Sequence, residues 1–328
     1  MTQFDLGLDD LRTYRPEVRE PADFDEFWAD TIAQARSAGG DVELSPISEP
    51  LEHVDIFDMT FPGYGGQPIK AWYSRPAGDD GDLPVVVQYQ GYGGGRGLAF
   101  EHTFWASAGY AHVMMDTRGQ GSAYGSGGDT PDPEGSGPAG PGYMTRGVES
   151  PAAYYFRRLL TDAVRAVDAA RALPGVDASR TVVTGGSQGG GIALAVAGLV
   201  PDLTAAMPDV PFMCHFERAV SITDADPYGE IRRYLAVHRD AVERTFTTLS
   251  YFDGVNFAKR ANAPTLWSAG LFDEICPPST GFAAFNWYGA GSAPDVRKEI
   301  EVYAFNNHEG GEAHQLRRQW AFLKDVLA

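Results

Sequence analysis

Cysteine is scarce in this chain of 328 residues, which contains only Cys214 and Cys276. Two thiols in so long a chain exclude the disulfide framework of a small secreted domain. No Cys-x-x-Cys pair occurs, so a zinc site of the thiolate type is not expected. The sequence therefore predicts no bound metal ion and a fold that depends on its hydrophobic core.

Basic residues are also few. Lysine and arginine together number 26 against 44 aspartates and glutamates, which gives a formal net charge of −18. A surface of this charge repels a phosphate backbone and an anionic membrane. We therefore expect neither nucleic acid nor a membrane among the partners.

Long hydrophobic runs are missing. No stretch of about 18 consecutive apolar residues occurs, so no transmembrane helix is predicted. The first ten residues have neither the basic nor the apolar segment of a signal peptide, so we expect a cytoplasmic protein. Hydrophobic residues make up 43% and charged residues 21%, which is a globular composition rather than a disordered one.

Short apolar runs and helical patterns alternate along most of the chain. Two strand patterns, 53–61 and 69–74, flank a Gly-rich turn and predict an antiparallel hairpin. Later strands are expected at 85–87, 111–115, 181–183, 265–267 and 300–303. Helices are expected at 159–173, 192–199, 279–288 and 312–327. This alternation predicts an α/β fold with a mostly parallel sheet and the hairpin at one edge.

We expect one domain over residues 1–328, because the alternation runs through most of the chain. Residues 1–50 form an N-terminal extension with an amphipathic helix at 23–38. Residues 119–147 are rich in glycine and proline and are interpreted as a functional loop, since strand–helix units continue on both sides. Residues 212–260 interrupt the alternation and are interpreted as a helical insertion.

A candidate nucleophile lies in the sequence Gly-Gly-Ser-Gln-Gly at 185–189, which fits G-x-S-x-G. A predicted strand precedes it and a predicted helix follows it, as in the nucleophile turn of α/β-hydrolases. The turn exposes the Ser187 hydroxyl at a helix N-terminus, where a developing negative charge is stabilised. An incidental serine in a Gly-rich turn is the alternative.

The base and the acid are expected after later strands, in the chain order of α/β-hydrolases. Asp273 follows the strand at 265–267, and His308 follows the strand at 300–303. The carboxyl ends of parallel strands lie at one edge of a sheet, which brings these residues towards Ser187. Glu274 is the adjacent alternative for the acid, and His314, inside the last helix, is the nearest rival base.

Two backbone N–H groups are expected to bind the oxyanion of a tetrahedral intermediate. One belongs to Gln188, directly after the nucleophile, and the other to Tyr92, in the Gly-rich loop 90–95 after an early strand. That loop does not fit the G-x-G-x-x-G pattern of a dinucleotide site. The ring of Tyr92, with Pro211 and Phe212, is the candidate wall of a small acyl pocket.

Several further motifs extend the pattern over nearly the whole chain. They are Tyr14–Glu17, Asp23–Trp28, Arg118–Gly121, Pro211–Cys214, Cys276–Thr280 and His308–Glu309. Together with the serine motif they resemble the acetyl xylan esterase and cephalosporin C deacetylase group, carbohydrate esterase family seven. The loop 122–128 departs from the bulkier residues usual in this group.

The resemblance implies an α/β-hydrolase fold with Ser187, Asp273 and His308 as the triad and Tyr92 and Gln188 as oxyanion donors. It implies deacetylation of short xylo-oligosaccharides and of cephalosporin C without a cofactor. It also implies a homo-hexamer whose active sites face an inner cavity. Arg118 is interpreted separately, as structural support that pairs with a carboxylate.

Three other functions stay open. A serine peptidase of the prolyl-oligopeptidase kind shares the triad order, but 328 residues leave no room for its propeller domain. A lipase-like enzyme would need an apolar lid helix, and none is evident. A catalytically dead carbohydrate-binding homologue would tolerate loss of Ser187, Asp273 or His308, yet all three are present.

Overall fold

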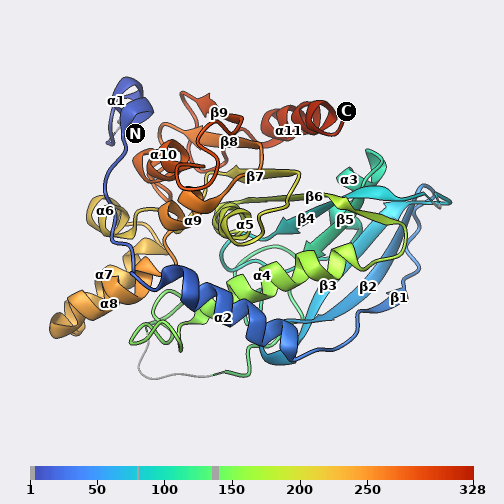
Figure 1. Ribbon diagram of the computed structural model, residues 1–328, viewed down its shortest axis with the longest axis horizontal. Helices are drawn as coiled ribbons and strands as arrows, with labels where there is room; N and C mark the ends of the chain where they lie inside the picture. The colour runs from blue at the N-terminus through green and yellow to red at the C-terminus, as the bar shows by residue number, and fades with distance from the viewer. Residues whose placement is uncertain (1–3, 80, 135–139) are drawn as a thin grey trace.

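The computed structural model describes residues 4–79, 81–134 and 140–328 (Figure 1). Within these residues nine strands form one sheet in the order β1-β2-β3-β5-β4-β6-β7-β8-β9. The strands are β1 (Glu43–Pro46), β2 (Val54–Pro62), β3 (Pro68–Pro76), β4 (Leu83–Tyr89), β5 (Ala111–Met115), β6 (Val176–Gly186), β7 (Ala205–Asp209), β8 (Thr265–Gly270) and β9 (Lys298–Tyr303).

The sheet is mostly parallel. Strand β4 pairs in parallel with β5 and β6, and the parallel pairing continues through β7 and β8 to β9. Strands β1, β2 and β3 are antiparallel to one another, and β3 joins the rest of the sheet antiparallel to β5. The predicted α/β fold with an antiparallel hairpin at one edge is therefore confirmed.

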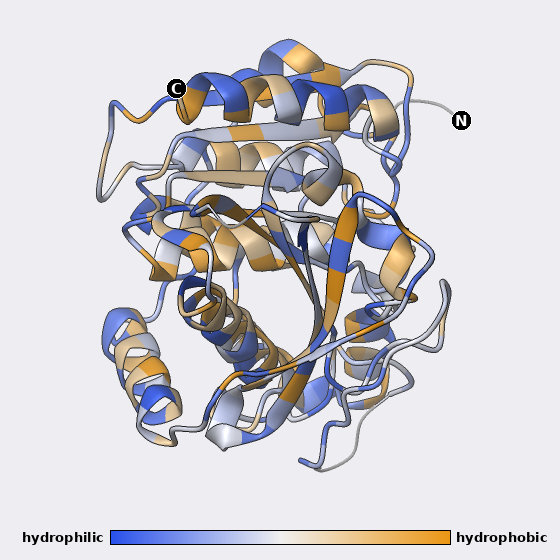
Figure 2. Ribbon diagram, turned by 90° about the vertical axis from the view of Figure 1, so that its right-hand side faces the viewer, coloured by the Kyte–Doolittle hydropathy of each residue, from blue (hydrophilic) through white to orange (hydrophobic). Residues whose placement is uncertain are grey.

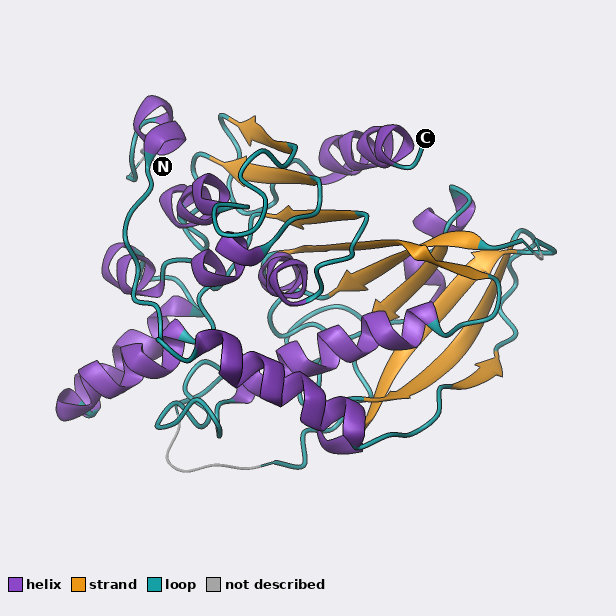
Figure 3. Ribbon diagram, in the orientation of Figure 1, coloured by secondary structure: helices purple, strands orange, loops and turns teal. Residues whose placement is uncertain are grey.

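Helices cover both faces of the sheet (Figure 3). They are α1 (Leu8–Thr13), α2 (Phe24–Ser37), α3 (Phe104–Ser107), α4 (Tyr155–Arg171), α5 (Gln188–Leu199), α6 (Phe216–Ile222), α7 (Tyr228–Val237), α8 (Val242–Ser250), α9 (Gly254–Arg260), α10 (Pro278–Trp287) and α11 (Glu312–Val326). Figure 2 shows the helices striped with hydrophilic and hydrophobic residues, as expected when one face is buried. No helix of the described residues is long and apolar enough to cross a membrane.

Two hydrophobic cores lie on opposite faces of the sheet. Val85 and Val87 of β4 contribute to the larger core, which contains α4 and α5, whereas Val86 contributes to the core beneath α3 and α11. Successive side chains of a strand point to opposite faces, so a strand buried on both faces must be apolar throughout. This explains the continuous valine run.

The N-terminal helix α2 packs on the chain's own insertion. Phe24 lies against Phe257 with ring centroids 5.2 Å apart, and Trp28 lies 5.5 Å from Phe252. The indole of Trp28 donates a hydrogen bond to the Tyr251 carbonyl oxygen (2.9 Å). The residues predicted as an insertion are largely helical, as α6 to α9, and lie between β7 and β8. Phe24 and Trp28 of α2 are thus buried without any second subunit.

Candidate active site

Ser187 lies in the sharp turn between β6 and α5, with φ 58° and ψ −119°. A positive φ is strained for a residue with a side chain, and the neighbouring glycines make the turn possible. A Cβ on Gly189 would lie 2.2 Å from the Tyr89 carbonyl oxygen, and one on Gly185 would lie 2.5 Å from the Gly189 backbone. Glycine is therefore required at both positions.

Main-chain hydrogen bonds hold the turn in place. The Ser187 N–H donates to the Asp209 carbonyl oxygen of β7 (3.0 Å), and the Phe212 N–H donates to the Ser187 carbonyl oxygen (2.9 Å). The strained residue is thus fixed from the neighbouring strand, which keeps its side chain at the edge of the sheet.

The structure brings the three predicted side chains together. His308 Nε2 lies 2.8 Å from Ser187 Oγ, and His308 Nδ1 lies 2.8 Å from Asp273 Oδ2. The second carboxylate oxygen of Asp273 accepts the backbone N–H groups of Ile275 (2.9 Å) and Cys276 (2.8 Å). Because Asp273 accepts the Nδ1 proton, Nε2 is free to accept the serine proton.

The rival residues lie elsewhere. Glu274 and His314 are exposed, and neither contacts His308 or Ser187 in the described part of the chain. His112 is buried in β5, where its Nδ1 donates to the His102 carbonyl oxygen (3.0 Å). Asp253 caps α9 and accepts the Val255 N–H (3.0 Å). The geometry therefore singles out Asp273 and His308.

Gln120 links the two segments that carry the predicted oxyanion donors. Its Oε1 accepts the Gly93 N–H (2.6 Å), and its Nε2 donates to Gln188 Oε1 (2.9 Å) and to the Tyr155 hydroxyl (3.0 Å). Within the described residues, the backbone N–H groups of Tyr92 and Gln188 donate to no protein acceptor. Both remain available to an oxyanion.

The side chain of Tyr92 points to a buried glutamate. Its hydroxyl lies 2.8 and 2.9 Å from the two carboxylate oxygens of Glu230 and accepts the Tyr143 N–H. Burial raises the pKa of Tyr92 and that of Glu230. The ring packs edge-on against Tyr143, with centroids 5.5 Å apart. The loop 90–95 is thereby anchored to α7.

The cavity beside Ser187 has a volume of about 280 Å³ and walls other than those expected. Gly91, Tyr124, Val210 and His308 are among its lining residues. Tyr124 comes from the loop 119–147, and its hydroxyl lies close to the backbone of Gly91. A Cβ atom added to Gly91 would lie only 2.5 Å from that hydroxyl oxygen. The sequence indicated a functional loop here but did not single out Tyr124.

The three predicted wall residues lie outside this cavity's lining. Phe212 is fully buried, with its ring 4.5 Å from that of Tyr228, and Pro211 is also buried. Tyr92 is directed to Glu230 as described. Phe212 supports the site from behind, because its N–H binds the Ser187 carbonyl oxygen and its ring lies 6.1 Å from that of Tyr92.

Arg118 is completely buried and paired with two carboxylates. Its Nη2 donates to Asp162 Oδ1 (2.8 Å), and its Nη1 donates to Asp132 Oδ1 (3.2 Å). Asp132 lies in the loop 119–147 and is also bound by Arg158. The predicted structural role of Arg118 is confirmed, since these bonds tie the loop to α4. Part of that loop, 135–139, lies outside the described residues.

Within the described ranges no group of three or more His, Cys, Asp or Glu side chains is arranged to hold a metal ion. Cys214 and Cys276 are both free thiols and both buried. Burial raises the pKa of each thiol, which favours the protonated and unreactive form.

The sheet and the strained serine turn are those of an α/β-hydrolase. Within this class the chain belongs to the acetyl xylan esterase (AXE1) family, whose model matches residues 1–326. The family is named for the hydrolysis of acetyl groups, which are held as carboxylic esters.

Two solved structures are similar over almost the entire chain. Acetyl xylan esterase from Paenibacillus sp. R4 is 39% identical, with a TM-score of 0.90 over 98% of this chain and 99% of that one. Acetyl xylan esterase 1 from Thermoanaerobacterium sp. JW/SL YS485 is 31% identical, with a TM-score of 0.89 over 99% and 100% of the two chains.

A curated relative is longer. Acetyl esterase Axe7A of Xylanibacter ruminicola is 28% identical over 309 residues, which are 90% of this chain. The chain spans about 65% of the length of that relative.

Proposed function

We propose that this protein is a serine carboxylesterase that removes acetyl groups from short acetylated xylo-oligosaccharides. The observation that carries the proposal is the 2.8 Å contact between Ser187 Oγ and His308 Nε2, in a member of the acetyl xylan esterase family. The resemblance extends the proposal to the acetyl ester of cephalosporin C. The cytoplasmic location expected from the sequence stays a prediction.

Acylation begins when His308 Nε2 takes the proton of the Ser187 hydroxyl and the oxygen attacks the acetyl carbonyl carbon. The resulting oxyanion accepts hydrogen bonds from the backbone N–H groups of Tyr92 and Gln188. The imidazolium then gives its proton to the sugar oxygen as the ester bond breaks, which leaves an acetyl group on Ser187. Asp273 stabilises the charged imidazole throughout.

Deacylation repeats the same steps with water. His308 takes a proton from a water molecule, and the hydroxide attacks the acetyl carbonyl carbon. The second tetrahedral intermediate collapses, Ser187 recovers its proton from His308, and acetate leaves. Every proton is passed between protein, sugar and water, so the cycle needs no cofactor.

Acyl-chain length is expected to have a strong effect on turnover. We expect kcat/KM to fall steeply from p-nitrophenyl acetate to the butyrate and to be nearly nil for the octanoate. A methylene group that fits a pocket gains about 0.8 kcal/mol, whereas one that does not fit costs about 1–3 kcal/mol in strain. The tight contact of Tyr124 with Gly91 supports a small site. Steady-state kinetics on the ester series tests this, and a profile that rises towards octanoate favours a lipase-like enzyme instead.

Assembly is the second part of the proposal. We expect light scattering to give a mass about six times that of the 35.4 kDa chain. The resemblance supports a hexamer, and the exposed side chains of Phe305 (91% exposed) and Val237 (74% exposed) are available for subunit contacts. Phe24 and Trp28 of α2 add no support, because they are buried within the chain. A clean monomer at micromolar concentration contradicts the hexamer.

A further inference from the structure

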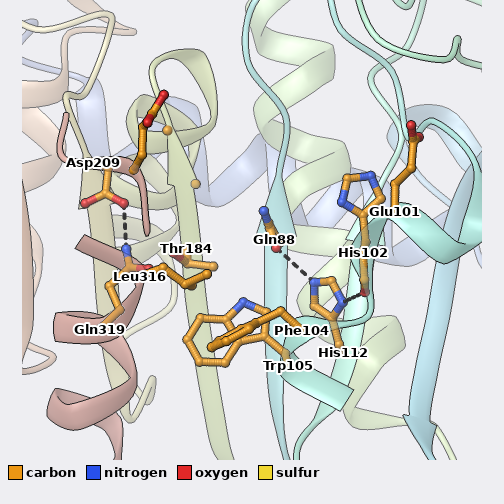
Figure 4. Close-up of a pocket in the computed structure, with 13 residues that line it drawn as sticks. Gln88, Glu101, His102, Phe104, Trp105, His112, Thr184, Asp209, Leu316 and Gln319 are labelled. Carbon is orange, nitrogen blue, oxygen red and sulfur yellow. Dashed lines mark hydrogen bonds between the residues drawn. The ribbon is translucent and has the colours of Figure 1, made fainter. Parts of the chain in front are cut away.

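A second cavity shares lining residues with the one beside Ser187, and Figure 4 shows the residues that surround it. Its volume is about 280 Å³, close to the lower end of small-molecule sites. Gln88, Gly186, Asp209 and Glu312 line both cavities, so the two spaces meet at the serine turn. We call this second space the side cavity. The described mechanism does not use it.

One wall of the side cavity is a carboxylate held from α11. Asp209 Oδ1 accepts a hydrogen bond from Gln315 (2.8 Å), and Oδ2 accepts one from Gln319 (2.6 Å). Burial raises the pKa of Asp209 to about 7. Each carboxylate oxygen has room for one more donor, so the group is oriented in advance to receive a ligand hydroxyl.

The opposite wall is a pair of neutral polar groups on β4 and β5. Burial lowers the pKa of His112 to about 3, so its ring is neutral. Its Nδ1 faces the His102 carbonyl oxygen and must carry the proton, which leaves Nε2 as an acceptor.

The state of His112 decides which way the amide of Gln88 points. Gln88 Oε1 is placed 3.1 Å from His112 Nε2, and two acceptors cannot share a hydrogen bond. The Gln88 amide is therefore assigned in the flipped orientation, with its NH₂ group donating to Nε2. Gln88 lines both cavities, so its carbonyl oxygen is then a second fixed acceptor where the two spaces meet.

Apolar side chains complete the side cavity. Trp105, Phe104 and Leu316 line it below the polar groups, and Figure 4 shows the two rings lying between the Asp209 wall and the His112 wall. No lysine or arginine is among its lining residues, whereas three carboxylates are. A negatively charged ligand is therefore disfavoured, and a neutral one with hydroxyl groups around an apolar ring face fits.

We propose that the side cavity is a subsite for a neutral sugar ring on the alcohol side of the acetyl ester. The leaving oxygen receives its proton from His308, and His308 lines the cavity from which the side cavity extends. The ring hydroxyls donate to Asp209 and Gln88, while an apolar ring face packs on Phe104, whose ring is exposed and covers the buried Trp105. This inference rests on the proposed esterase function and names the part of the substrate that gives specificity.

Filling the side cavity tests the proposal. Leu316→Trp on α11 adds bulk to its apolar part, and Arg317→Trp places the same side chain on the exposed side of the helix as the matched control. Hydrolysis of acetylated xylobiose is compared with that of p-nitrophenyl acetate, which has no sugar. We expect Leu316→Trp to lower the ratio of the two kcat/KM values at least tenfold through KM, and Arg317→Trp to leave the ratio unchanged.

A second variant covers the case in which Leu316→Trp fails to fold. Gln88→Met keeps the size of the side chain and removes its acceptor, and we expect it to lower the same ratio at least fivefold. Unesterified xylobiose should inhibit p-nitrophenyl acetate hydrolysis less strongly in both variants than in the wild type.

The outcomes separate the two proposals. A ratio within twofold of wild type in both folded variants refutes the subsite and leaves the esterase function standing. Wild-type protein that hydrolyses p-nitrophenyl acetate but not acetylated xylobiose refutes both the subsite and the proposed xylo-oligosaccharide substrate, and leaves only a serine esterase activity standing. Wild-type protein that hydrolyses neither ester refutes the proposed function itself.

Discussion

Replacing Ser187 with alanine is expected to lower kcat for p-nitrophenyl acetate by about 10³- to 10⁶-fold. The hydroxyl oxygen is the atom that forms the acyl-enzyme, and its proton acceptor lies 2.8 Å away. Only the oxyanion donors and substrate binding remain in the variant, and these supply the residual rate. Steady-state kinetics of the purified variant gives the magnitude.

A matched control separates catalysis from folding. Ser221 is an exposed serine on α6 whose hydroxyl donates to the nearby Arg218 carbonyl oxygen (2.7 Å). Ser221→Ala should keep the wild-type rate, and both variants should show the same circular dichroism spectrum. Retention of more than a tenth of the activity in a folded Ser187→Ala protein would exclude the serine mechanism.

Loss of His308 is expected to be almost as damaging. His308→Ala should lower kcat by a similar factor, because the serine and its base act as one unit and removal of either disables both. The imidazole accepts the serine proton on one side and is held by Asp273 on the other. Kinetics at a fixed pH, with the same ester, measures the effect.

His314→Ala is the matched control for the base. His314 follows closely in the sequence, but it is exposed on α11 and distant from these contacts. Its removal should change kcat by less than about twofold, as expected for a surface substitution. Loss of activity in His314→Ala with an active His308→Ala would show that the base is assigned to the wrong residue.

Local patterns in the sequence predicted most of the central strands and the helices α2, α4, α5, α10 and α11, but strand β7 and the short helix α3 were not predicted. The strand at 111–115 has the predicted bounds, and the last helix ends one residue earlier than predicted. Continuous apolar runs predict strands that are buried on both faces. A helix is predicted from apolar residues that recur with its period over about a dozen residues.

The edge strand β1 was not predicted, and the reason is its exposure. Glu43–Pro46 is largely exposed and has no alternation of apolar and polar residues. Only its pairing with β2 makes it a strand. The short helix α1 was missed for a similar reason, since Leu11 is its only buried residue.

The sequence by itself determined the residues that meet at the site. Ser187, Asp273 and His308 each follow a recognisable strand, and parallel strands place their carboxyl ends at one edge of a sheet. Chain order and local pattern therefore predicted a contact across 121 residues, from Ser187 to His308.

Only the tertiary structure decided where the surrounding side chains point. Tyr92 was expected in the acyl pocket, but its hydroxyl instead donates a hydrogen bond to the buried carboxylate of Glu230. Glu230 lies 138 residues further along the chain. Tyr124 approaches Gly91 because the preceding residue, Ala123, donates its N–H to the Gly93 carbonyl oxygen (3.1 Å). A side chain's direction depends on contacts between segments far apart in the sequence, and no local pattern of residues records those contacts.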